Sequence, residues 1–180
     1  MPEQPARAAY EDNMVELKRI SADAIPHALE RAERYRLLQE PELAESICLD
    51  ILSADPDQPQ ALVSLLLALT DQFSQGLSGR LQRANDLVPR LSSEYERAYY
   101  AGIIAERSAR FHLAHAKPGF SHRAFEELNE AMRCYERAES LRHAGNDDAL
   151  LRWNTCARSI RSRGLKPAAV EVEKVEYPLE

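Results

Sequence analysis

Residues 44–69, which read AESICLDILSADPDQPQALVSLLLAL, constrain the fold more than any other stretch of the chain. The apolar residues of its first half recur at helical spacing, which predicts one buried helix face. Pro56 ends this helix because it has no N–H for the next hydrogen bond and disfavours helix at the residue before it. Pro59 suits the first turn of a following helix, with Asp57 or Gln58 as the N-cap. The stretch therefore predicts two helices joined by a short turn.

The remainder of the chain divides into further helices. Their boundaries follow from apolar periodicity, from prolines and from a capping box in which Ser93 is followed three residues later by Glu96. Adjacent helices with short links form antiparallel hairpins. We expect helices over residues 10–20, 26–39, 42–52, 60–73, part of 81–91, 95–116, 122–142 and 149–163.

The hairpins recur at a regular interval. From His27 to Ala61 is 34 residues (61 − 27 = 34), which is the period of the tetratricopeptide repeat. Residues 28–56 resemble that repeat at its two small positions, its aromatic position and its closing proline, which are Ala32, Ala44, Tyr35 and Pro56. In the third hairpin, Ala101 and Gly102 match the small pair of the same pattern.

The resemblance covers residues 26–160 and is closest in the first repeat and around residues 131–157. Arg31 and Cys48 depart from the family pattern, which has an apolar residue and an aromatic residue at those positions. The resemblance implies an all-α fold, an antiparallel helix-hairpin array that forms a TPR-like superhelix of about three and a half repeats. The last helix would then be the C-terminal cap that such arrays require.

In the tetratricopeptide family the first helix of each hairpin lines a concave groove that binds a peptide or a partner's helix. The resemblance implies a groove formed by Ser64, Leu67, Tyr99, Tyr100, Ile103, Arg152, Thr155 and Arg158. The chaperone-binding branch of the family grips a C-terminal carboxylate with Lys and Asn residues, whereas this chain has apolar and aromatic residues there. An apolar groove is therefore expected, and the alternative is that these residues are interhelical core.

Composition narrows the class of protein. With 180 residues, 44% hydrophobic and 29% charged, the chain fits one soluble globular domain. Its net charge of −6 argues against a general nucleic-acid binder. The first residues lack the apolar core of a signal peptide, and no apolar run is long enough to span a membrane, so a cytoplasmic location is expected. Three cysteines without metal-like spacing are expected to be thiols in a reducing compartment.

Three histidines provide a second hypothesis. His112 and His115 are three residues apart and share a helix face, and His122 follows the next turn, so together they have the chemistry of a zinc site. Exposed histidines near a helix end, where they favour the helix dipole, are the simpler interpretation. The chain also lacks the nucleophile and phosphate-binding motifs of common enzymes. We expect no catalytic residue, metal or cofactor, with a small helical metal-binding protein or enzyme as the alternative.

The favoured function is a non-catalytic scaffold or adaptor that binds a protein or peptide, with no nucleic acid and no membrane as partner. A self-associating repeat protein, a homo-oligomer, is a further alternative. Residues 1–9 are expected to be disordered, residues 10–163 to form the helical domain, and residues 164–180 to form an extended tail. Because apolar residues alternate with glutamates in this tail, we expect residues 167–180 to dock on a helical surface of the same chain or of a second subunit.

Overall fold

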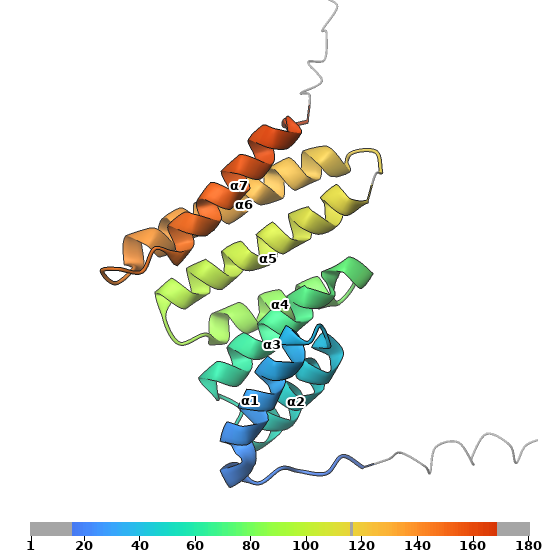
Figure 1. Cartoon of the computed structure of the whole chain (residues 1–180), viewed down its shortest axis with the longest axis vertical. Helices are drawn as coiled ribbons and strands as arrows, with labels where there is room; N and C mark the ends of the chain where they lie inside the picture. Colours follow the sequence, from blue (N-terminus) through green and yellow to red (C-terminus); the bar gives the residue numbers. More distant parts are fainter. Residues whose placement is uncertain (1–15, 116, 169–180) are drawn as a thin grey trace, which may run out of the picture.

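The computed structural model describes residues 16–115 and 117–168. This part of the chain is all-α and contains seven α-helices, with short 3-10 turns at Ala22–Ala24, Gln72–Gln75 and Val88–Arg90. The α-helices are α1 (Ile25–Leu37), α2 (Pro41–Ala54), α3 (Pro59–Asp71), α4 (Arg80–Leu87), α5 (Glu94–Ala114), α6 (Phe120–Leu141) and α7 (Asp148–Arg163). The helices form one stack, with α1 and α2 at one end and α6 and α7 at the other (Figure 1). Each helix packs against the next one in an antiparallel direction, as the sequence predicted.

Local caps and prolines explain where the helices begin. Pro59 is the first residue of α3, and the side chain of Gln58 accepts a hydrogen bond of 2.8 Å from the backbone N–H of Ala61. The predicted capping box opens α5, since Ser93 and Glu96 each accept from the other's backbone N–H. Pro89 lies two residues past the end of α4, in the 3-10 turn Val88–Arg90, so α4 has only eight residues. These predicted boundaries are confirmed.

The helix expected over residues 10–20 is absent from its described part. Residues 16–20 have no regular secondary structure, and Leu17 is 88% exposed. A segment this short is helical only when a neighbouring surface covers its apolar side. Residues 10–15 lie outside the described part of the chain, as do residues 1–9. The predicted docking of the tail also lies outside it, apart from residues 167 and 168.

Two clusters of buried residues make up the core. The N-terminal cluster is centred on α3 and includes Leu62, Leu66, Leu69 and Phe73. The C-terminal cluster lies between α5, α6 and α7 and includes Leu128, Tyr135 and Cys156. Leu67 and Tyr100 pack against both clusters and so connect the two halves of the stack.

Small residues allow the helices to approach closely within this core. Ala32 and Ala44, which match the small positions of the repeat pattern, are both fully buried. Gly102 has the tightest surroundings of the described glycines, because a Cβ added there would lie 2.5 Å from Cε1 of the Tyr135 ring. The ring of Tyr135 therefore occupies the space that any other residue at position 102 would need.

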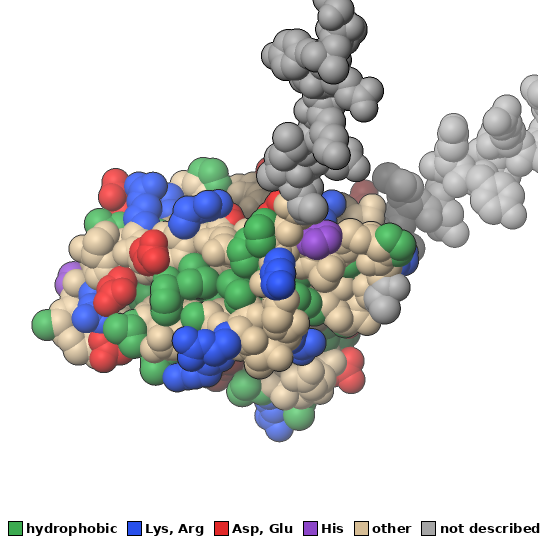
Figure 2. Space-filling view, turned by 90° about the horizontal axis from the view of Figure 1, so that it is seen from above, with side chains coloured by type: hydrophobic (Ala, Val, Ile, Leu, Met, Phe, Trp, Pro, Cys, Tyr) green, Lys and Arg blue, Asp and Glu red, His purple; other side chains and the backbone are tan. Residues whose placement is uncertain are grey.

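The far end of the stack remains partly apolar on its outside. Seen from above, the end formed by α6 and α7 has hydrophobic side chains in its middle and charged side chains around them (Figure 2). On α7, Leu151 is 59% exposed. Within the described residues, every helix is too short or too polar to cross a membrane.

The three free cysteines are expected to react slowly with thiol reagents in the folded protein. Cys48 and Cys156 are buried, and burial raises the pKa of each thiol to about 12, while burial raises the pKa of Cys134 to about 11. At pH 8 these thiols stay protonated, and the thiolate is the reactive form. We expect Cys48 and Cys156 to be labelled only as fast as the protein unfolds. Following 5,5′-dithiobis(2-nitrobenzoate) labelling at pH 8 tests this, with Cys134→Ser to isolate the buried pair; immediate labelling of that pair would contradict it.

Candidate functional site

A row of hollows follows one face of the stack, which we call the groove face because α1, α3, α5 and α7 line it. The first hollow, of about 700 Å³, lies between α1, α3 and the start of α5. It shares Glu96 and Tyr100 with a second hollow of about 460 Å³ near the start of α7. The second shares Tyr99 and Asp148 with a third, of about 300 Å³, between α5 and α7. Shared lining residues thus place the three hollows next to one another across the four helices.

The first hollow has an apolar floor and an acidic rim. Its floor consists of half-buried side chains at four-residue spacing on successive helices, which are Ile25 and Leu29 on α1, Val63 and Leu67 on α3, and Tyr100 on α5. Residues four apart lie on the same side of a helix, so each helix presents a short apolar stripe. Glu30 and Glu33 on α1 are exposed at the margin. The hollow combines apolar contact area with negative charge.

Three tyrosines of α5 line the second hollow, which shares Tyr100 with the first hollow and Tyr99 with the third. The rings of Tyr95 and Tyr99 stack with their centroids 5.7 Å apart, and Tyr99 meets Tyr100 edge-on at 5.3 Å. The hydroxyl of Tyr95 accepts a hydrogen bond of 2.9 Å from the side-chain amide of Asn146. Aromatic rings with one polar end are well suited to surfaces that are half apolar and half wet.

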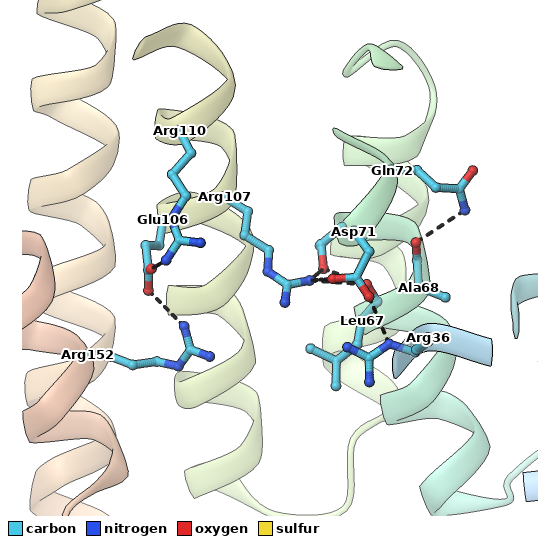
Figure 3. A network of polar contacts seen from close by, with 10 residues as sticks. Arg36, Leu67, Ala68, Asp71, Gln72, Glu106, Arg107, Arg110 and Arg152 are labelled. Atoms are coloured by element: carbon cyan, nitrogen blue, oxygen red, sulfur yellow. Dashed lines mark hydrogen bonds and ion pairs between the residues drawn. The ribbon is translucent and has the colours of Figure 1, made fainter. Parts of the chain in front are cut away.

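A chain of charged side chains connects α1, α3 and α5 beside the first hollow, which Arg36 also lines. Nε of Arg36 donates to Oδ2 of Asp71 at 2.9 Å, and Nη1 of Arg107 lies 2.5 Å from the other carboxylate oxygen (Figure 3). Arg107 also donates to the backbone carbonyl of Leu67 at 3.1 Å. Burial lowers the pKa of Arg107 and Asp71 opposes that shift. The carboxylate of Asp71 thus links α1, α3 and α5 through Arg36 and Arg107.

A second group of polar contacts connects α5, α6 and α7 around Glu106, which is only 2% exposed. Its carboxylate accepts from Nη1 of Arg152 at 3.0 Å and from Arg110 (Figure 3). It also accepts from the hydroxyl of Tyr135 at 2.7 Å. Arg152 also donates from Nε to the hydroxyl of Tyr99 at 3.0 Å. Burial, reinforced by Glu106, raises the pKa of Tyr135, so its hydroxyl keeps the proton that it donates. Glu106 is therefore a buried charge with several partners.

The structure brings most of the predicted groove residues to the groove face. The residues that line its hollows are Ser64, Leu67, Tyr99, Tyr100, Arg152 and Thr155. Ile103 is 2% exposed and lies in the C-terminal core cluster, so it is closed to a ligand. Arg158 is exposed on α7 but outside the hollows described above. Contact of the first six residues with a ligand stays a prediction.

Sequence reasoning missed the charged residues that connect these helices. For Glu106 a signal was present, because it lies four residues after Gly102 and three before Ala109, so the helical period places it among buried positions. A buried carboxylate needs partners. Asp71 lies 35 residues after Arg36 and 36 before Arg107, which is close to the 34-residue interval of the hairpins. Opposite charges at that interval were the signal for the contacts among these three residues.

The three histidines do not gather into one site. His112 is buried, contrary to the expectation that these histidines are exposed, because its Nδ1 lies 2.7 Å from the carboxylate of Glu127 on α6. Nδ1 of His115 contacts the carbonyl of Phe111, and Nδ1 of His122 that of Lys166. In residues 16–115 and 117–168, no group of three or more His, Cys, Asp or Glu side chains is arranged to hold a metal ion. This geometry lends the metal hypothesis no support.

Comparison of the chain with protein-family models, with curated proteins and with solved structures finds no match. No family is identified. What the structure establishes is an all-helical protein whose described part has seven helices packed in sequential pairs. The groove face is therefore the feature of the molecule that bears on its function.

Proposed function

We propose that this protein is a non-catalytic interaction module that binds a peptide or helix of a partner protein on its groove face. The row of adjacent hollows along α1, α3, α5 and α7 carries the proposal. Half-buried apolar and aromatic side chains line the first two hollows, and such side chains provide binding energy when a partner removes them from water. We assign the protein to the cytoplasm, in keeping with its three free thiols.

We further propose that the helix pairs form a tetratricopeptide-like array of three repeats and a final half repeat. The pairs would be α1 with α2, α3 with α4, and α5 with α6, with α7 as the half repeat. The 34-residue interval between His27 and Ala61 supports this assignment, as does the full burial of Ala32 and Ala44. The hollows lie along the first helices of these pairs, where an array of this kind binds its ligands.

A blocking variant tests the binding surface without disturbing the core. Ser64 is a small, half-buried residue in the first hollow, so Ser64→Arg places a long side chain in the groove face. We expect 16-residue peptides selected by the wild-type protein from a displayed random library to bind this variant at least about tenfold more weakly. Fluorescence anisotropy with labelled peptides measures the change. Arg152 is a poorer choice, because its bonds to Glu106 and Tyr99 make its replacement a test of stability.

A matched control removes apolar surface elsewhere. Leu43→Ala with Leu49→Ala shortens two exposed leucines of α2, which are 47% and 46% exposed and lie outside the hollows described. Peptide affinity should stay within about twofold of wild type in this control. Circular dichroism should show unchanged helical content in all variants. A library that yields no binder, or binders that Ser64→Arg leaves unaffected, would refute the proposed function.

A further inference from the structure

Acidic side chains surround the first two hollows of the groove face. Glu30, Glu33 and Glu96 line the first hollow, and Glu94, Glu96 and Asp148 line the second. Arg36 is the one arginine or lysine among the residues that line these two hollows, against five carboxylates, and it pairs at 2.9 Å with Asp71, which also pairs with Arg107. This end of the groove face therefore has net negative charge.

The position of Glu30 and Glu33 separates them from the other carboxylates. Glu94, Glu96 and Asp148 lie in the first turns of α5 and α7, where the helix dipole stabilises negative charge. Glu96 also accepts hydrogen bonds from the backbone N–H groups of Ser92 and Ser93. Glu30 and Glu33 lie beyond the first turn of α1 and are exposed beside the apolar floor. Glu30 lies 3.9 Å from Nδ1 of His27 on the same helix, and capping explains neither carboxylate. A cationic partner would give both of them a counter-charge.

The terminal segments of this chain do not have the matching charge. Residues 169–180 contain four glutamates and one lysine, and residues 1–15 contain Glu3, Glu11 and Asp12 with Arg7 as the only basic residue. Like charges across an interface suppress binding. A second molecule with lysine or arginine is the better complement to this surface.

The length of the surface sets the length of that partner segment. Packed helices lie about 8–10 Å apart, so crossing from α1 over α3 and α5 to the start of α7 covers on the order of 25 Å. An extended segment of about 8 residues or a helix of about 16 residues spans that distance.

We propose that the first two hollows bind a segment of a partner protein that carries apolar anchor residues flanked by lysine or arginine. The anchors would pack on the floor formed by Leu29, Val63, Leu67 and Tyr100, and the cationic side chains would face Glu30 and Glu33. This inference rests on the proposed function and adds the charge of the partner to it.

Two synthetic helical peptides of 16 residues test the charge. Both have leucine at the same positions on one face, and the polar face is lysine in one peptide and glutamate in the other. We expect the wild-type protein to bind the lysine peptide at least about tenfold more tightly by fluorescence anisotropy. Glu30→Gln with Glu33→Gln should weaken the lysine peptide by about fivefold. Raising the salt concentration should weaken it further, because salt screens exposed charges.

The control removes the same amount of charge, two carboxylates, from α4 and α6, which do not carry the floor of the first hollow. Asp86→Asn with Glu126→Gln neutralises two exposed carboxylates of α4 and α6 that lie outside the hollows described. The lysine peptide should bind this control within about twofold of wild type. Equal loss in the control, or equal or tighter binding of the glutamate peptide, would overturn the inference. If library peptides bind and respond to Ser64→Arg but are not cationic, the proposed function stands and this inference fails.

Discussion

Replacing Glu106 by alanine is expected to lower the free energy of unfolding by about 3 kcal/mol. The change leaves the hydroxyl of Tyr135 and the guanidinium of Arg152 without the carboxylate to which both donate. Glu106 is only 2% exposed, so water has little access to this site. Removing one partner of a buried charged group costs more than removing an exposed pair, because the remaining groups have lost their water. Because Arg152 is partly exposed, water can replace part of the lost contact in the variant, which limits the loss of stability.

Urea unfolding followed by circular dichroism measures this effect. Glu106→Gln keeps the shape and can still accept a hydrogen bond, so we expect it to cost about half as much. The matched control is Glu130→Ala, which removes the same side chain from an exposed ion pair with Arg133 on α6. Such an exposed pair contributes little to stability, because water and salt screen it. An equal shift of the unfolding midpoint for Glu106→Ala and Glu130→Ala would show that the contacts around Glu106 contribute no special stability.

Gly102→Val is expected to destabilise the protein by a similar amount, about 3 kcal/mol. A Cβ at this position would lie 2.5 Å from Cε1 and 2.8 Å from Cδ1 of Tyr135. The ring cannot move aside easily, since it is fully buried and its hydroxyl donates to Glu106. Substitution of glycine in the middle of a helix normally gains helix propensity, so a loss here would come from the clash.

A double-mutant cycle isolates that clash. Tyr135→Leu removes the ring, and Gly102→Val should then cost about 1–2 kcal/mol less than it does in the wild-type protein. Chemical unfolding of the two single variants and the double variant gives the coupling energy. Additive effects of the two substitutions would mean that Gly102 and Tyr135 do not share the space between α5 and α6.

The ends of several helices were predictable from the sequence, because they depend on residues nearby in the chain. The side chain of Gln58 caps α3, Ser93 and Glu96 cap α5, and Pro89 limits α4. Each depends on the backbone within about four residues, where proline geometry and side-chain caps act. The seven helices and their sequential antiparallel packing follow from the same signals, because short links leave adjacent helices little choice of direction.

The tertiary structure alone decided which side chains face the hollows and which face the core. Tyr99, Tyr100 and Ile103 lie close together on α5, yet the two tyrosines line the hollows and Ile103 is buried. A helix turns 100° per residue, so a small rotation of α5 against α6 exchanges core and surface positions, and packing of Tyr135 on Gly102 sets that rotation. The contacts of Asp71 with Arg36 and Arg107 likewise arise only when α1, α3 and α5 lie side by side. The sequence by itself determined the seven helices and their order, because those depend on local backbone chemistry, although it also predicted a helix over residues 10–20 that is absent from residues 16–20. The shape and charge of the groove face depend instead on contacts between residues roughly 30 or more positions apart.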